Sequence, residues 1–208
     1  MEKLNHIWSK DHQYVYCNNS KVLKADIQTF RVLNAIFAKD THHVFYIEGI
    51  AHGIDASTFI PLDVGKTEKT DSVYAKEFQR WRYRGYGKDK NHIYFHDMMS
   101  GKPRTVKGAD SESFEVLDFD YSKDCNHVYY YGHRVKEANS SNFEIINAFF
   151  ARDNKFVFYG ANVIPKINPE NFEVIGDYES KWSFWGKDEH YLVHQNELFA
   201  KLEPLESI

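Results

Sequence analysis

Short runs of β-branched and aromatic residues recur along the chain and are separated by glycine, asparagine and aspartate. Runs such as His43–Tyr46 and His127–Tyr130 predict a strand, because they are rich in residues that favour a pleated, half-buried backbone. Glycine or asparagine follows each run, where a tight hairpin turn requires a positive φ. A second short strand is predicted after the turn, as at Asn162–Ile164, and a third at segments such as Phe172–Ile175. The expected hairpin positions are Asn18, Asn19, Gly49, Gly101, Gly132 and Gly160.

A Lys-Asp or Arg-Asp pair marks each recurrence. Its aspartate is found at Asp11, Asp40, Asp89, Asp124, Asp153 and Asp188. Asp11 and Asp40 are 29 residues apart, as are Asp124 and Asp153, and a fixed period of this length indicates an internal repeat. Most copies also carry a phenylalanine four residues after an aspartate or asparagine, and we predict that this phenylalanine is a core residue. The phenylalanines are Phe30, Phe59, Phe114, Phe143 and Phe172, and the residues before them are Asp26, Asp55, Asp110, Asn139 and Asn168.

The repeat predicts an all-β fold of tandem three-stranded antiparallel units, about 29 residues each, in five to six copies. We expect residues 1–208 to form a single repeat domain. The expected units lie near 8–36, 37–64, 86–120, 121–149 and 150–178, with a partial copy at 185–200 and an insert at 65–85. Both a propeller-like ring and a stacked, twisted β-repeat fit the pattern. Propeller blades usually have four strands, so the sequence does not choose between the two assemblies.

Composition narrows the class of protein. Aromatic residues make up 16% of the 208 residues, which favours β-cores, and the net charge of −4 argues against a general nucleic-acid binder. Cys17 and Cys125 occupy different repeat positions and are expected to be reduced thiols. The first residues contain no apolar leader, and no later stretch is long enough to span a bilayer. We therefore expect a cytoplasmic protein without a membrane partner, or a periplasmic or surface protein if a leader has been removed.

Two segments resemble the signature of the DKNYY family, a bacterial repeat family named for its Asp-Lys-Asn-Tyr-Tyr motif. They are Lys88–Phe95 and Lys123–Tyr130, and the similarity continues through Ala109–Leu117 and Ala138–Ile146. It covers most of the chain apart from the insert and the last residues. This chain has histidine where the family name has its first tyrosine. The resemblance implies a bacterial tandem repeat and brings no activity or site residue with it.

The pattern of repeated polar residues favours a structural role for them over a metal-binding or catalytic role. Each landmark turn supplies one carboxylate, whereas a calcium loop needs several oxygen ligands close together, so an Asx turn is the favoured interpretation. His43, His92 and His127 share a repeat position with Tyr14, Phe156 and Tyr191, which indicates a packing position with a polar tip. The sequence contains no nucleophile motif. We expect no metal, no cofactor and no catalytic residue, although paired carboxylates that meet only in space stay open.

The insert contains the candidate binding residues. Arg80, Trp81, Arg82, Tyr83 and Arg84 alternate strictly, so that a strand here would place three guanidinium groups on one face and two aromatic rings on the other. Arginine and aromatic residues concentrate at protein interfaces, which favours a partner-binding edge. A half-buried structural strand shows the same alternation, and that alternative stays open.

These observations predict a non-enzymatic protein-binding repeat module, and in a concrete version a bacterial immunity protein that blocks a toxin. The alternatives are a carbohydrate-binding protein or carbohydrate-active enzyme that uses exposed aromatic rings, and an exported surface repeat protein. A toxin-like neighbouring gene would favour the first hypothesis, and a sugar operon would favour the second.

Overall fold

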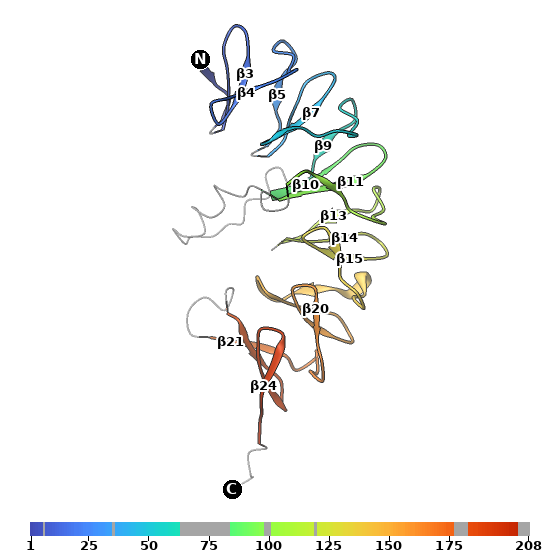
Figure 1. Ribbon diagram of the computed structural model, residues 1–208. Helices are drawn as coiled ribbons and strands as arrows, with labels where there is room; N and C mark the ends of the chain where they lie inside the picture. The colour runs from blue at the N-terminus through green and yellow to red at the C-terminus, as the bar shows by residue number, and fades with distance from the viewer. Residues whose placement is uncertain are drawn as a thin grey trace. The chain divides into compact units, whose positions relative to one another are not determined.

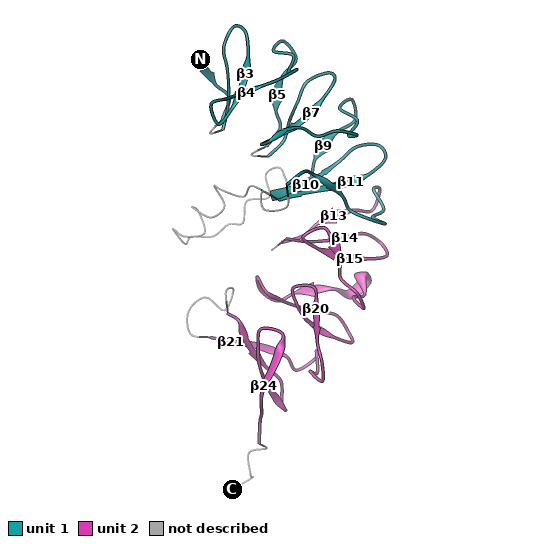
Figure 2. Ribbon diagram, in the orientation of Figure 1, with its two compact units in different colours: residues 1–111 teal, residues 112–208 magenta. Residues whose placement is uncertain are grey.

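The computed structural model describes residues 1–5, 7–34, 36–62, 84–97, 101–118, 120–176 and 183–203. Within these ranges the chain forms 24 short β-strands and one short 3₁₀-helix, η2 (Ser140–Asn142). No helix of the described ranges is long and apolar enough to cross a membrane. The chain divides into two compact units, residues 1–111 and 112–208 (Figure 2).

The first unit contains three antiparallel sheets of four strands, with the strands in sequence order (Figure 1). Sheet A consists of β1 (Glu2–Lys3), β2 (Trp8–Lys10), β3 (Val15–Cys17) and β4 (Ser20–Val22). Sheet B consists of β5 (Arg31–Val32), β6 (Ala38–Lys39), β7 (Val44–Tyr46) and β8 (Gly49–Ile50). Sheet C consists of β9 (Ile60–Pro61), β10 (Arg84–Lys88), β11 (Ile93–Asp97) and β12 (Arg104–Thr105).

The second unit has the same construction, again with three four-stranded antiparallel sheets in sequence order. Sheet D consists of β13 (Glu115–Val116), β14 (Tyr121–Lys123), β15 (Val128–Tyr130) and β16 (His133–Arg134). Sheet E consists of β17 (Glu144–Ile145), β18 (Phe150–Arg152), β19 (Val157–Tyr159) and β20 (Asn162–Ile164). Sheet F consists of β21 (Glu173–Ile175), β22 (Trp185–Lys187), β23 (Tyr191–His194) and β24 (Glu197–Lys201).

The all-β prediction is confirmed, but each sheet has four strands where the sequence predicted units of three. The additional strand ends at the landmark Lys or Arg, which the sequence had suggested lies in a turn. In sheet B this strand is β6, where Ala38 pairs with both Val32 and Phe45. In sheets B to F the first strand is the segment after the landmark phenylalanine, so the sheet boundaries are offset from the sequence period. All six sheets of the described ranges are open, and the choice between ring and stack stays a prediction.

The predicted hairpin turns are present. Asn18 and Asn19 both have positive φ, of 47° and 66°, between β3 and β4. Tyr131 and Gly132, with φ of 50° and 70°, make the equivalent turn between β15 and β16. Two successive residues of positive φ form the turn whose twist matches that of an antiparallel hairpin.

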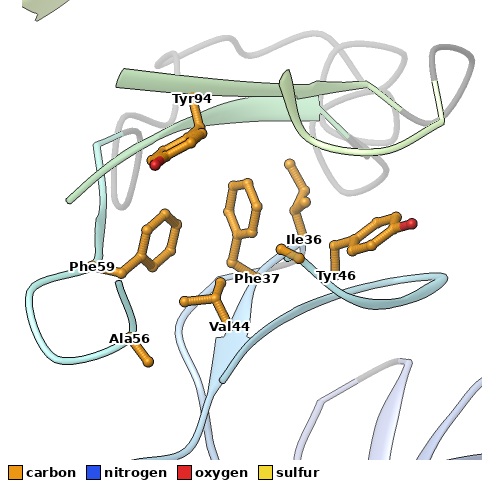
Figure 3. Close-up of a cluster of buried hydrophobic side chains, with 8 residues drawn as sticks. Ile36, Phe37, Val44, Tyr46, Ala56, Phe59 and Tyr94 are labelled. Carbon is orange, nitrogen blue, oxygen red and sulfur yellow. The ribbon is translucent and has the colours of Figure 1, made fainter. Parts of the chain in front are cut away.

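Successive sheets within a unit pack face to face, and their contact is the core. We call the face of a sheet that points to the following sheet its forward face, and the opposite face its backward face. In sheet A, Trp8 and Val15 lie on the forward face and cluster with Phe30, which precedes sheet B, and with Phe45 of sheet B. In sheet B, Phe37 packs against Phe59, their ring centroids 5.1 Å apart (Figure 3). The second unit repeats the pattern, with Phe150 of sheet E 5.2 Å from Phe172.

The prediction that the landmark phenylalanines are core residues is confirmed for three of the five. Phe30, Phe59 and Phe172 are buried. Phe114 and Phe143 are only half-buried. Phe143 packs one side of its ring against Tyr121 and Phe158, and lies at the margin of that cluster.

A small residue two positions before each landmark aspartate makes room for the phenylalanine. At Gly87 an added Cβ would overlap the end of the Phe59 ring, and at Gly186 it would overlap the end of the Phe172 ring. The equivalent residues in the other sheets are the buried Ser9, Ala38, Ser122 and Ala151. The ring therefore lies directly on the backbone of the second strand.

Candidate functional site

The six landmark aspartates form one recurring turn. Oδ1 of each accepts the backbone N–H groups two and three residues further along the chain, at 2.6–2.9 Å. This is the Asx turn that the sequence favoured over a metal loop. It ends the second strand of a sheet and starts the hairpin that leads to the third.

The second carboxylate oxygen joins successive repeats. Oδ2 of Asp40 accepts the backbone N–H of Asp26 at 2.9 Å, and Oδ2 of Asp153 accepts that of Asn139 at 2.9 Å. The same bond links Asp55 to Asp89 and Asn168 to Asp188. The donors are the residues four positions before the landmark phenylalanine. One aspartate therefore holds its own turn and also the segment that leads into the first strand of its sheet.

These bonds keep the buried carboxylates of Asp40 and Asp89 ionised. Burial by itself would raise the pKa of Asp40 and Asp89, but the backbone N–H groups of Asp26, His42 and His43 around Asp40 outweigh it. The pKa of both carboxyls is therefore lowered. At Asp89 the Tyr94 hydroxyl also donates to Oδ2, at 2.9 Å. A buried charge held by several donors in this way stabilises the native state and leaves little acceptor capacity for a ligand.

In sheets B and E the basic residue of the landmark makes the corresponding link to the segment that leads to the following sheet. Lys39 is buried, and its Nζ donates to the carbonyl oxygens of Ala56 and Phe59 at 2.7 and 2.9 Å. Burial lowers the pKa of Lys39. Arg152 donates to the carbonyl of Pro169 at 3.0 Å in the same way. In sheets B and E the Lys/Arg-Asp pair thus binds both the segment that precedes its sheet and the segment that follows it.

A further set of turn residues was missed by the sequence interpretation. Asn34 accepts the backbone N–H groups of Ile36 and Phe37 through Oδ1, at 2.9 and 2.7 Å. Asn5 and Asn147 make the same turn in sheets A and E. Each stands six residues before a landmark aspartate, and that spacing is the signal that could have revealed them.

The recurring histidines pack against neighbouring rings. His43 lies 5.8 Å from the Phe45 ring and His127 lies 6.2 Å from the Tyr129 ring, centroid to centroid. Phe156 makes the equivalent contact with Phe158 in sheet E. The described ranges hold no group of three or more His, Cys, Asp or Glu side chains placed to bind a metal. Cys17 is buried, which raises the pKa of its thiol to about 11, while Cys125 is exposed.

His96 differs from the other histidines because it is buried between sheets B and C. Its ring lies 5.2 Å from that of Tyr46 and 6.1 Å from that of Phe37. Neither ring nitrogen has a hydrogen-bond partner at standard geometry. Burial lowers the pKa of His96; Asp97, Glu48 and the Gly101 backbone act in the opposite direction, and Arg104 adds to the lowering.

We expect His96 to make the first unit sensitive to acid. The unfolded chain binds a proton at His96 near the ordinary pKa of about 6.5, whereas the folded chain binds it only at a lower pH. Stability should therefore be complete above that value and fall as the pH drops from 7 to 5. In thermal unfolding, His96→Phe should reduce this fall, and the matched variant of the exposed His52, His52→Phe, should not. An equal pH dependence in wild type and His96→Phe would contradict this assignment.

Of the candidate partner-binding residues, Arg84 alone lies in the described ranges. It is the first residue of β10, is half-buried, and stands opposite Asp97 in the register of β11. Arg80, Trp81, Arg82 and Tyr83 lie outside the described residues, as does the rest of the insert before Arg84. The insert joins β9 to β10, which are neighbours in sheet C.

The fold and its joints define a class: a tandem β-repeat protein in which a recurring Lys/Arg-Asp pair fastens four-stranded sheets in sequence order. The chain belongs to the DKNYY family, whose sequence model matches residues 1–97 and 75–200. These matches include the insert, which the resemblance seen in the sequence had left out. No curated protein and no solved structure matches the chain.

Proposed function

We propose that the protein is a non-enzymatic protein-binding repeat module, and that it acts in the bacterial cytoplasm as an immunity protein covering the active site of a toxin. The motif residues support a scaffold role, because their carboxylate and ammonium groups are engaged in turns and joints. Recognition then belongs to residues that the repeat does not use. The insert before Arg84 is the largest such segment.

The observation that carries the proposal is the place of the insert. The first and second strands of the other sheets are joined by short connections, such as residues 33–37 in sheet B and 146–149 in sheet E. In sheet C the same connection runs from residue 62 to 83. Both its ends are fixed, because β9 and β10 pair through Ile60 with Lys88 and Pro61 with Gly87. A long segment on a rigid base is a common arrangement for a recognition loop.

Arginine residues suit this role chemically. A guanidinium group binds carboxylates and phosphates through two parallel hydrogen bonds, and it is weakly hydrated. Three of them in a chain of net charge −4 would give a local basic surface. Such a surface speeds association with an acidic partner and adds specificity.

The test compares the triple variant Arg80→Ala, Arg82→Ala, Arg84→Ala with a variant of equal charge change, Lys102→Ala, Lys107→Ala, Lys136→Ala. These three lysines are exposed. The candidate partner is the protein encoded by the gene next to this one, and its binding is measured by calorimetry and by relief of growth inhibition. Wild type and the lysine variant should bind with a Kd below about 1 µM, and the arginine variant at least about tenfold more weakly.

Two outcomes would count against the proposal. Equal affinity of the arginine and lysine variants would remove the insert from recognition. Absence of any complex between wild type and the toxin candidate, with growth inhibition unrelieved, would contradict the immunity role. Circular dichroism of the arginine variant checks that its sheets are intact. The single Arg84→Ala variant separates the effect of Arg84, which begins β10, from the effect of Arg80 and Arg82.

A further inference from the structure

The sheets at the two ends of the described chain each carry a face equivalent to those used in the internal joints. Inside the units, an aromatic residue three positions before the landmark aspartate packs against the phenylalanine that precedes the next sheet. The ring-centroid distances of these pairs are 5.4 Å for Trp8–Phe30, 5.1 Å for Phe37–Phe59, 5.3 Å for Tyr121–Phe143 and 5.2 Å for Phe150–Phe172. The residue at this position in sheet F is Trp185.

The forward face of sheet F is apolar and accessible. Phe172 and Val193 are buried on its backward face, so Trp185, Leu192 and His194 lie on the forward face with the alternation of the strands. Phe199, which is 65% exposed, contacts Trp185 there at a ring-centroid distance of 5.0 Å. Trp185 is half-buried, whereas its equivalents in the five other sheets are buried.

The landmark lysine of sheet F shows the same difference. In sheets B and E the landmark basic residue donates to carbonyl groups of the following segment. Lys187 makes an ion pair with Glu173 of its own sheet at 2.9 Å, as Arg152 does with Glu144, but its side chain is more exposed, at 42% against 31% for Arg152. Lys187 thus occupies the position that, at Lys39 and Arg152, contacts the segment leading to the next sheet.

Sheet A carries the complementary backward face. Val15 and Cys17 of β3 are in the core on its forward face, so Tyr14 and Tyr16 lie on the other side, with Lys21 over the Tyr14 ring at 2.9 Å. Leu23 extends this side and is 69% exposed. At its repeat position the other copies have His52, Lys107, Lys136 and Pro165.

Met1 occupies the register position of the landmark phenylalanine. It precedes Glu2, which pairs with Lys10, just as Phe30 precedes Arg31, which pairs with Lys39. Met1 is 78% exposed. A methionine side chain packs well on an aromatic ring, so it can take the place of phenylalanine against a tryptophan.

Exposed apolar side chains gather at these two ends. The described ranges contain six large hydrophobic residues classed as exposed, and one of them, Ile60, is in sheet C. Four of the others, Met1, Tyr14, Leu23 and Phe199, belong to sheets A and F, while Phe184 packs its ring on Phe149 at a centroid distance of 4.4 Å and does not lie on the forward face of sheet F. Repeat proteins that remain monomeric usually carry a polar outer face on their end repeats.

We propose that the protein associates head to tail, with the forward face of sheet F in one copy stacked on the backward face of sheet A in a second copy. This contact continues the interface that joins successive sheets within each unit, with Met1 and Leu23 of one copy covering Trp185 and Phe199 of the other. It uses two different surfaces, so it can extend from copy to copy. The proposal rests on sheets A and F and does not depend on the proposed toxin binding.

The full chain, measured by light scattering after size exclusion from about 1 µM to about 1 mM, should grow in mass with concentration above the 24.5 kDa monomer. Phe199→Glu places a charge on the forward face of sheet F, and Leu23→Glu places one on the backward face of sheet A. Each variant alone should associate at least about tenfold more weakly than wild type. Ile60→Glu, a matched change at a 48% exposed residue away from both faces, should associate like wild type.

The decisive arm mixes the two variants. Phe199→Glu keeps an intact sheet A and Leu23→Glu keeps an intact sheet F, so an equimolar mixture should form a one-to-one complex and no larger species. A wild-type chain that stays monomeric throughout would overturn the proposal, whether the faces are covered by the chain itself or by water. Association of Leu23→Glu with itself at wild-type strength would also overturn it, because it would indicate a symmetric contact between two copies of sheet F.

Discussion

Replacing Phe59 by alanine is expected to lower the free energy of unfolding by about 3–5 kcal/mol, as for other large-to-small changes in a packed core. The Phe59 ring is fully buried, lies 5.1 Å from Phe37 of sheet B and covers the backbone at Gly87. Its removal opens a cavity between sheets B and C. Chemical denaturation followed by tryptophan fluorescence and circular dichroism measures the change.

Two control variants make this result specific. Phe199→Ala removes an equal ring from an exposed position and should change stability by no more than about 0.5 kcal/mol. Phe143→Ala, at the half-buried copy of the same repeat position, should fall between the two. A loss below about 1 kcal/mol for Phe59→Ala would show that the sheets are not held together through this residue.

Replacing Asp153 by alanine is expected to lower the free energy of unfolding by about 2–4 kcal/mol, because three partly buried N–H groups lose their acceptor. The carboxylate of Asp153 accepts the N–H groups of Lys155 and Phe156 in its own turn, and that of Asn139 from the preceding segment. Asp153→Asn keeps an oxygen that can accept the N–H groups of the turn, but it replaces the oxygen that accepts the N–H of Asn139 with an NH₂ group. This variant should therefore retain part of the stability. Denaturant midpoints of the three proteins measure the two contributions separately.

Asp11 provides the matched control for this experiment. It makes the same turn bonds, to Gln13 and Tyr14, but it is half-exposed, and its Oδ2 accepts the Tyr16 hydroxyl of its own sheet at 2.8 Å in place of an N–H group from a preceding segment. Asp11→Ala should therefore destabilise the protein less than Asp153→Ala. Equal losses at the two positions would mean that the turn alone matters and that the joint contributes nothing.

Local signals in the sequence predicted the strands that they directly encode. The runs after each landmark aspartate and the segments after each phenylalanine form strands within a residue or two of the predicted bounds. The strand before the aspartate was missed, because segments such as Ala38–Lys39 are two residues long and stand beside a turn. Only pairing with strands on both sides makes such a segment a strand, and that pairing is not visible in local propensity.

In the candidate site, too, contacts between residues close in sequence were predictable, and contacts between distant residues were not. The Asx turn of each landmark aspartate follows from residues two and three positions away, so the sequence favoured it. The bond from Asp26 to Asp40 joins residues 14 apart and required the fold. The burial of His96 was also invisible, because its repeat position holds Asn18, Ile47, Tyr131 and Gly160 in other copies. The arginines of the insert stay a prediction, except that Arg84 begins a strand.

The central claim is that the recurring aspartate joins successive repeats, and amide hydrogen exchange measured by NMR tests it most directly. The amides of Asp26, Asp55, Asn139 and Asn168 donate to the landmark carboxylates of the following sheet. The amides of Gln28, Ser57, Ser141 and Glu170 donate to the side chains of those four residues in exposed turns and serve as internal references. The account predicts that the first set exchanges at least about 100-fold more slowly than the second, at rates close to those of the central strands. Exchange of both sets at the same fast rate would contradict it.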